Sequence, residues 1–312
     1  MIVSCQNSRL AQLLSMRLGK PLVTYNLVNF ADTESLVTLT MSEEELVSKT
    51  VVLVFQFSSF CLQDKPKYHI NNELWQLLLV ANTLKQRGVK KLVGLLPYLP
   101  YARHDKKDAA GFAGSFAFVG KLLQAAGFDE LISCDVHSTQ NALLLPFPLR
   151  TISLVPFWAN FLKQQGVDRN TCIAAPDVGG LARAQALAQE LGLALATLEK
   201  TRIGVDQSVS LTLTGDVAGK RVVVIDDIID TAGTALHAYQ RIREHGARMV
   251  EGCFSHAVLS AGAHQLVQDG CFDKLYVTNS LLLDQEQVPS TITVLAIDEF
   301  LANALAEEKG LW

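Results

Sequence analysis

Short runs of apolar residues alternate along the chain with longer segments in which apolar and polar positions recur at helical spacing. The apolar runs predict strands at residues 91–96, 131–136, 171–175, 193–198 and 221–225. The amphipathic segments predict helices at residues 72–87, 116–126, 157–165, 181–191 and 298–308. Glycines typical of helix C-termini recur at Gly88, Gly127, Gly166, Gly192, Gly246 and Gly270. This alternation predicts an α/β fold with mainly parallel sheets flanked by helices.

The pattern has the same layout in both halves of the chain. A length of 312 residues with 49% hydrophobic content is enough for more than one core. Pro146 and Pro148 interrupt regular structure near the middle. We therefore expect an N-terminal domain at residues 1–148 and a C-terminal domain at 149–312, with the last helix a candidate to pack on the N-terminal domain. Residues 58–69 have no periodicity and predict an exposed loop or flap.

Composition and charge narrow the class of protein. The net charge of −4 and the isoelectric point near 6.0 indicate no general attraction to nucleic acid or to an anionic membrane. The six cysteines have no metal-ligand spacing and favour reduced, buried thiols. Neither a leader-like apolar segment nor a run approaching ~18 apolar residues is visible. We expect a cytoplasmic protein that binds neither nucleic acid nor membrane.

The most informative segment is residues 221–234, RVVVIDDIIDTAGT. Residues 222–225 predict a strand buried on both faces, and Asp226 and Asp227 follow at its carboxyl end, where open α/β sheets place ligands. The next residues open a helix and supply backbone N–H groups and hydroxyls for a phosphate: Thr231, Ala232, Gly233 and Thr234. The acids can accept hydrogen bonds from ribose hydroxyls, directly or through hydrated Mg²⁺. A plain strand, turn and helix start is the alternative, and so much polar chemistry in one turn favours a sugar-phosphate cradle.

Three further polar clusters follow predicted strand ends. In residues 95–108, Tyr98 and Tyr101 offer faces for a nucleobase and Arg103 a planar fork for phosphate, although a solvated loop is the alternative. His137 follows another strand and is as readily structural as functional. Asp177 follows a third strand, just before two glycines, and can share a Mg²⁺ with His137.

Two weaker signals complete the sequence-level site. Lys200 and Arg202 follow a strand and precede a polar stretch, which suits a mobile loop that stabilises a transferring phosphoryl group. An exposed hairpin with incidental cations would explain them equally well if they stood alone. Phe30, Asp32 and Glu34 form an aromatic and acidic turn.

Segment 221–234 resembles the phosphoribosyl pyrophosphate motif shared by type I phosphoribosyltransferases and ribose-phosphate pyrophosphokinases. The order of all the segments resembles the pyrophosphokinase family over nearly the whole chain. That resemblance implies two similar type I phosphoribosyltransferase-like domains with the active site between them. It implies a ribose-phosphate diphosphokinase that moves the β,γ-diphosphoryl group of ATP to the 1-hydroxyl of ribose 5-phosphate, with Mg²⁺. A homo-oligomer, dimer or hexamer, is also implied.

The resemblance assigns roles by position. Lys200 and Arg202 match the catalytic loop, and His137 and Asp177 match the metal positions. The residues matched to ATP contacts are Phe30, Asp32, Thr33, Glu34, Arg103, His104 and Asp108. Those matched to ribose 5-phosphate contacts are Arg202, Asp226, Asp227, Asp230, Thr231, Ala232, Gly233 and Thr234.

The chain also departs from the family pattern. His104 stands where the family has glutamine, and residues 109–115 lack a basic residue that regulated members carry. We expect catalysis to be kept and regulation by phosphate and ADP to be lost. Three alternatives stay open: a phosphoribosyltransferase, a non-catalytic nucleotide-binding regulator, and an enzyme acting on another pentose phosphate. A second half with its own aromatic turn argues against the first, and the presence of Lys200 and Arg202 against the second.

Overall fold

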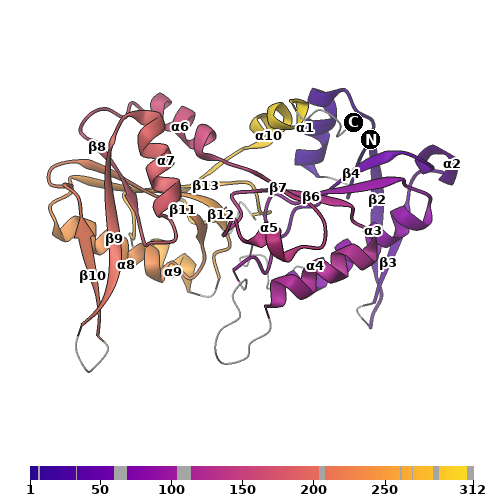
Figure 1. Ribbon diagram of the computed structural model, residues 1–312, viewed down its shortest axis with the longest axis horizontal. Helices are drawn as coiled ribbons and strands as arrows, with labels where there is room; N and C mark the ends of the chain where they lie inside the picture. The colour runs from indigo at the N-terminus through magenta and orange to yellow at the C-terminus, as the bar shows by residue number, and fades with distance from the viewer. Residues whose placement is uncertain are drawn as a thin grey trace. The chain divides into compact units, whose positions relative to one another are not determined.

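A computed structural model describes residues 1–5, 8–32, 34–59, 69–103, 114–203, 208–260, 262–268, 270–283 and 288–307. The chain divides into two compact units (Figure 1). The first comprises the chain up to Ser58, the segment that ends at Ile152, and the C-terminal segment from Ile297. The second comprises Ser59 and the segment Ser153–Ala296.

The first unit is a seven-stranded sheet in the order β3-β2-β1-β4-β5-β6-β7. Its strands are β1 Ile2–Cys5, β2 Leu22–Asn29, β3 Ser35–Leu39, β4 Thr50–Val54, β5 Lys91–Leu95, β6 Glu130–Cys134 and β7 Leu149–Ile152. Its helices are α1 Arg9–Leu18, α2 Glu43–Leu46, α3 Ile70–Gln86, α4 Ser115–Ala126, α5 Asn141–Leu144 and α10 Asp298–Ala306. Helices α1 and α10 pack together on one face, and α3 and α4 on the other (Figure 1).

The second unit repeats this plan with the order β10-β9-β8-β11-β12-β13-β14. Its strands are β8 Thr171–Ala175, β9 Ala194–Ile203, β10 Ser208–Thr214, β11 Arg221–Ile229, β12 Met249–Ala257, β13 Lys274–Thr278 and β14 Ile292–Leu295. Its helices are α6 Val155–Gln164, α7 Leu181–Leu191, α8 Gly233–Glu244 and α9 Ala263–Gln268. Helices α6 and α7 cover one face, and α8 and α9 the other (Figure 1).

The two sheets have the same strand order, because adding seven to each strand number of the first sheet gives the order of the second. In each sheet only the pair at one edge is antiparallel, β2 with β3 and β9 with β10. The order reverses between β1 and β4 and again between β8 and β11. Such reversal points leave a crevice at the carboxyl ends of the strands, where α/β proteins bind ligands. The expected pair of similar, mainly parallel α/β domains is therefore confirmed.

The division of the chain does not fall at residue 148. Strand β7 pairs in parallel with β6, from Leu131↔Leu149 to Cys134↔Ile152, so it completes the first sheet. The final helix α10 contacts α1, and Arg17 forms an ion pair with Glu299. The described C-terminal residues thus return to the first unit after the second is complete.

Sequence rules explain why these elements end where they do. Ser8 caps the N-terminus of helix α1, because its hydroxyl accepts a hydrogen bond from the N–H of Ala11 at 3.3 Å. Gly127 and Gly192 end α4 and α7 in the left-handed conformation, with φ of 107° and 64°.

None of the described helices combines the length and apolar character required to cross a membrane. Cys134, Cys172, Cys253 and Cys271 are buried free thiols, whereas Cys5 is exposed.

Candidate active site

The acid pair Asp226 and Asp227 lies within strand β11, which continues to Ile229. The predicted strand end at residue 225 is therefore wrong. Pairing with β12 persists as far as Ile229↔Ala257, whereas pairing with β8 stops at Val224↔Ala174. Because a neighbour holds β11 on one side only from that point, the strand extends past the end of β8. The two acids consequently stand at the reversal point of the second sheet.

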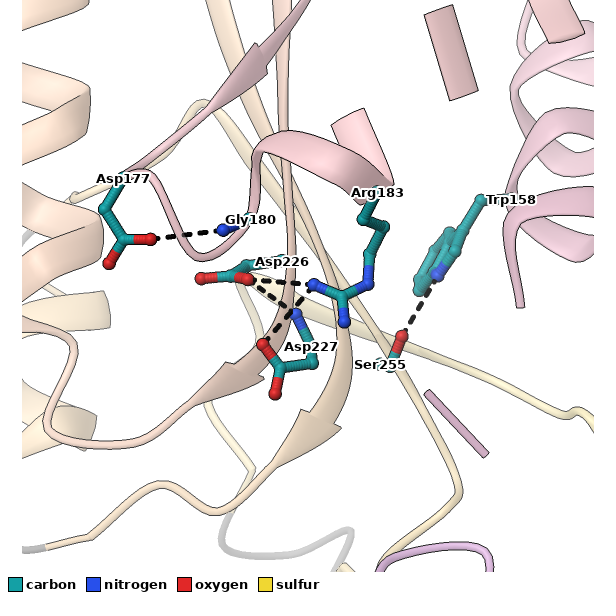
Figure 2. A network of polar contacts seen from close by, with 7 residues as sticks. All are labelled: Trp158, Asp177, Gly180, Arg183, Asp226, Asp227 and Ser255. Carbon is teal, nitrogen blue, oxygen red and sulfur yellow. Dashed lines mark hydrogen bonds and ion pairs between the residues drawn. The ribbon is translucent and has the colours of Figure 1, made fainter. Parts of the chain in front are cut away.

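Arg183, in the first turn of α7, faces both acids (Figure 2). Its Nη1 lies 3.0 Å from Asp226 Oδ1 and 3.4 Å from Asp227 Oδ1. The backbone N–H of Asp227 donates a second hydrogen bond to the same Asp226 oxygen, at 2.9 Å. The Arg183 side chain is only 13% exposed. A single guanidinium nitrogen of Arg183 thus contacts both adjacent carboxylates in a largely buried environment.

The turn between β8 and α7 brings backbone close to the acids. The N–H of Gly180 donates to Asp177 Oδ1 at 3.2 Å (Figure 2). A Cβ atom on Gly180 would lie 3.1 Å from Asp226 Oδ1 and 3.3 Å from Pro176 Cδ, closer than most such contacts. Glycine therefore lets the turn approach Asp226 without a clash. Asp177 follows the end of β8, and Asp226 lies in β11, the strand next to β8 across the reversal point.

The electrostatics of the pair follow from this crowding. Burial, reinforced by the charge of Asp227, raises the pKa of Asp226 well above its usual range, while Arg183 opposes the rise. The charge of Asp177 raises the pKa of Asp226 further. Two adjacent carboxyl groups with one cation nearby can accept hydrogen bonds from the hydroxyl groups of a ligand.

The segment after β11 forms the predicted helix start. Ala232 has a left-handed φ of 63° and precedes Gly233, the first residue of α8. The residue before the helix, Ala232, makes no side-chain capping hydrogen bond, and a helix N-terminus presents backbone N–H groups in geometry suited to an anion. A Cβ atom on Gly233 would meet only Thr231 Oγ1, at 3.8 Å. Asp230, Thr231 and Thr234 flank this turn, as the sequence predicted.

The two predicted metal positions lie in different units. His137 is exposed in the segment after β6, beside Asp135, which has a positive φ of 36°. Asp177 is half-buried after β8. In the ranges that the structure describes, no three His, Cys, Asp or Glu side chains cluster as a metal site would. Because Mg²⁺ usually takes one or two carboxylates and completes its shell with water and phosphate, the carboxylate of Asp177 still fits that ion.

The aromatic and acidic turn is the tip of the β2–β3 hairpin. The N–H of Phe30 donates to the carbonyl of Glu34 at 2.8 Å, and the N–H of Glu34 donates to Asp32 Oδ1 at 3.1 Å. The side chain of Phe30 is 51% exposed. Thr33 lies outside the described residues. An exposed ring next to a carboxylate is a suitable edge for a nucleobase.

The segment after β5 differs in part from its predicted role. Arg103 is exposed there, as a phosphate contact requires. Tyr98 is only 8% exposed, so its predicted role as a stacking face is wrong, because the ring is part of the core. Tyr101 has a φ of 64° and donates a hydrogen bond from its hydroxyl to Asn71 Oδ1. His104 and Asp108 lie outside the described residues.

Lys200 and Arg202 lie on strand β9, so their placement in a loop after that strand is wrong. They pair with Leu211 and Val209 of β10 in an antiparallel hairpin. The ladder explains the difference, because its hydrogen bonds extend β9 beyond the apolar run at residues 193–198. The side chains of Lys200 and Arg202 lie outside the described part of the structure.

Sequence reasoning missed Arg183. It lies in the predicted helix 181–191, where no role was predicted for it. The available signal was electrostatic, since a cation in the first turn of a helix opposes the helix dipole and needs a separate reason.

Two mainly parallel sheets with the same strand order define a duplicated phosphoribosyltransferase-type fold, and an acid pair followed by a helix start lies at the reversal point of the second sheet. Residues 152–276 match the phosphoribosyl transferase domain, and residues 1–127 match the N-terminal domain of ribose phosphate pyrophosphokinase. The chain therefore belongs to the ribose-phosphate pyrophosphokinase family.

Individual relatives are similar to this chain over almost its full length. The chain is 31% identical to ribose-phosphate pyrophosphokinase of Campylobacter jejuni, over 96% of this chain and 92% of that protein. It is 33% identical to ribose-phosphate pyrophosphokinase 2, chloroplastic, of Oryza sativa, over 96% of this chain and 72% of that protein. The crystal structure of phosphoribosylpyrophosphate synthetase from Mycobacterium smegmatis superposes with a TM-score of 0.86 at 28% identity, covering 98% of this chain and 97% of that one.

Proposed function

We propose that the protein is a ribose-phosphate diphosphokinase that converts ATP and ribose 5-phosphate into AMP and phosphoribosyl pyrophosphate. The observation that carries the proposal is the position of Asp226 and Asp227 in β11, a few residues before the N-terminus of α8 at Gly233. Carboxylates suit the hydroxyls of a pentose, and a helix N-terminus suits its phosphate. Full-length kinship with ribose-phosphate pyrophosphokinases supports the same activity.

On the sugar side, Asp226 and Asp227 accept hydrogen bonds from the ribose hydroxyls. The 5-phosphate accepts hydrogen bonds from the N–H groups at the start of α8 and from the hydroxyls of Thr231 and Thr234. Asp230 lies beside these groups in the chain. Ala232 and Gly233 present backbone without a bulky side chain. Such fixation aims the 1-hydroxyl at a second substrate, which is the main contribution a protein makes to phosphoryl transfer.

On the nucleotide side, the hairpin tip with Phe30, Asp32, Thr33 and Glu34 binds the adenosine part of ATP. Arg103, with His104 and Asp108 after it in the chain, binds the polyphosphate. The exposure of Phe30 and Arg103 is compatible with these roles.

Mg²⁺ accompanies ATP in this proposal, and Asp177 and His137 are the residues that would hold it. When bound, the ion neutralises phosphate charge and orients the β- and γ-phosphates. Asp177 is already oriented by the N–H of Gly180. Exposure of the His137 ring leaves it accessible to a nucleotide complex.

Lys200 and Arg202 supply the positive charge needed as the diphosphoryl group moves to ribose 5-phosphate. The hydroxyl oxygen of the sugar forms a bond to the β-phosphorus, the bond from that phosphorus to the α-phosphate oxygen breaks, and AMP departs. The proton of the hydroxyl leaves to solvent. Positive charge on this hairpin can stabilise the transition state without a covalent intermediate.

We also propose that the protein works as a homo-oligomer, either a dimer or a hexamer. Large apolar side chains at the surface of the first unit support assembly, notably Phe118 on α4 at 62% exposure and Leu143 on α5 at 85%. Sedimentation at several protein concentrations tests this, and a monomer at all of them would contradict it.

The decisive experiment is a coupled assay of purified protein with ATP, Mg²⁺ and ribose 5-phosphate, with and without inorganic phosphate. AMP and phosphoribosyl pyrophosphate should form in equal amounts, and at the same rate without phosphate. Formation of AMP with another pentose phosphate only would change the substrate. Absence of AMP together with tight nucleotide binding would indicate a regulatory protein.

A further inference from the structure

Arg183 is a largely buried charge of the second unit that the proposed mechanism does not use, and it contacts both acids assigned to the sugar. Its 13% exposed side chain makes two close contacts, at 3.0 Å with Asp226 and 3.4 Å with Asp227. Both contacts come from the same nitrogen, Nη1. A cation placed in this way acts on the shape and charge of the acid pair.

The distribution of donors on Asp226 is uneven. Its Oδ1 accepts from Arg183 and from the N–H of Asp227, at 3.0 Å and 2.9 Å. The other carboxylate oxygen points away from Arg183 (Figure 2). Two donors on one oxygen fix the plane of a carboxylate, since rotation about its side chain would break both hydrogen bonds. The second oxygen is thereby presented in one direction.

We infer that Arg183 is a positioning residue that orients the carboxylates of Asp226 and Asp227 for the hydroxyls of ribose 5-phosphate. The inference rests on the proposed function, because it concerns the same sugar site. Arg183 acts through the acids and makes no contact with the reacting phosphorus. It also offsets the repulsion between adjacent carboxylates, which would otherwise turn apart.

A purely structural ion pair is the competing explanation, because an arginine between α7 and β11 also stabilises the fold. The two explanations differ in what they change. A structural role lowers the melting temperature and leaves the Michaelis constant of ribose 5-phosphate alone in the molecules that remain folded. A positioning role changes that constant selectively, because a misoriented acceptor weakens the sugar contact and leaves ATP unaffected.

The test compares Arg183→Met, which removes the donor, with Arg183→Lys, which keeps one cationic nitrogen. Arg183→Met should raise the KM for ribose 5-phosphate about ten-fold or more, as loss of an oriented charged hydrogen bond implies. The KM for ATP should stay within about two-fold. Arg183→Lys should recover much of the loss, because a single nitrogen makes both contacts in the native protein. Arg241→Met, on the exposed face of α8 beside Glu244, is the matched control.

A double-mutant cycle then asks whether Arg183 acts through Asp226. Asp226→Asn should cost clearly less in the Arg183→Met protein than in the native one, since the orientation is already lost. Additive effects, or an unchanged KM for ribose 5-phosphate in Arg183→Met, would overturn the inference. If Arg183→Met fails to fold, the same cycle uses Arg183→Gln, which also removes the cation.

Calorimetric titration of the native protein with ribose 5-phosphate alone separates this inference from the proposed function. Native protein that neither binds ribose 5-phosphate nor forms AMP would refute the proposed function, and the inference with it. Native protein that binds and reacts, alongside an Arg183→Met variant of equal affinity, would refute only the role of Arg183.

Discussion

Glu73 on α3 accepts two hydrogen bonds from Ser58, from its backbone N–H at 2.9 Å and from its hydroxyl at 2.6 Å. Ser58 is the last residue of the first unit before the chain enters the second, where the Ser59 hydroxyl donates to the carbonyl of Val258 at 2.8 Å. The buried carboxylate therefore anchors the point at which the chain leaves the first unit. Burial raises the pKa of Glu73 to about 7, although the hydrogen bonds from Ser58 limit the rise.

This pKa has a consequence for stability against pH. In the unfolded chain a glutamate titrates near 4.3, so between that value and about 7 the folded protein binds the extra proton. The contribution of Glu73 to the free energy of unfolding is greatest at low pH. It falls by up to about 3 kcal/mol as the pH rises through about 7. Glu73→Gln, which keeps an acceptor for the Ser58 N–H, should flatten this slope in unfolding experiments at pH 5 to 8. Glu190→Gln, at an exposed ion pair, should leave it unchanged; equal slopes in all three proteins would contradict the assignment.

Asp226→Asn replaces a carboxylate oxygen with an amide that donates instead of accepting. If Asp226 binds a ribose hydroxyl, the KM for ribose 5-phosphate rises about ten-fold or more and the KM for ATP changes little. Initial-rate kinetics with each substrate varied in turn measures both. Asp216→Asn, at an exposed pair with Lys220, is the control. An unchanged KM for the sugar would remove Asp226 from the site.

Gly233→Ala tests the helix start as a phosphate site. The added methyl group meets only Thr231 Oγ1 at 3.8 Å, and alanine favours helix over glycine by up to about 1 kcal/mol, so the melting temperature should hold or rise. A phosphate resting on this backbone would be pushed outward, and the KM for ribose 5-phosphate should increase about ten-fold.

Gly192→Ala should behave in the opposite way, because Gly192 ends α7 with a φ of 64°. A side chain in that conformation costs about 1–2 kcal/mol, while the sugar site is untouched. Thermal unfolding and kinetics of the two variants should therefore separate. An unaltered KM in Gly233→Ala would place the phosphate elsewhere.

Lys200→Ala removes proposed countercharge from the transition state. We expect kcat to fall by about 10²–10³, with ATP affinity largely retained, because the interaction forms only as phosphoryl charge develops. Turnover measured with equilibrium binding of ATP distinguishes the two effects. Lys163→Ala, at a half-exposed pair with Glu190, controls for lost surface charge. Native turnover in Lys200→Ala would exclude this lysine from the mechanism.

Much of the fold could be predicted from the chain because its signals are local. Strand 171–175 and helix 181–191 were predicted with the bounds that β8 and α7 have in the structure. A continuous apolar run and a helical repeat closed by glycine need no distant residue to be recognised. The acid pair and the turn before α8 were recognisable for the same reason, since strand, acids and helix start are contiguous.

Contacts between distant residues decided what the sequence by itself left open. Hydrogen bonding to β12 extends β11 beyond Asp226, and hydrogen bonding to β10 extends β9 to include Lys200. Packing buried the ring of Tyr98. Local patterns cannot report these outcomes, because a hydrogen-bond partner or a covering side chain from another element determines each of them.

The sequence determined the alternation of strands and helices, the likeness of the two halves and the residues available for the sugar site. Tertiary structure alone returned α10 to the first unit and brought Arg183 to Asp226 across 43 positions of the chain. The physical reason is that a side chain's chemistry is inherent in its residue type, whereas its charge environment depends on which neighbours folding places around it.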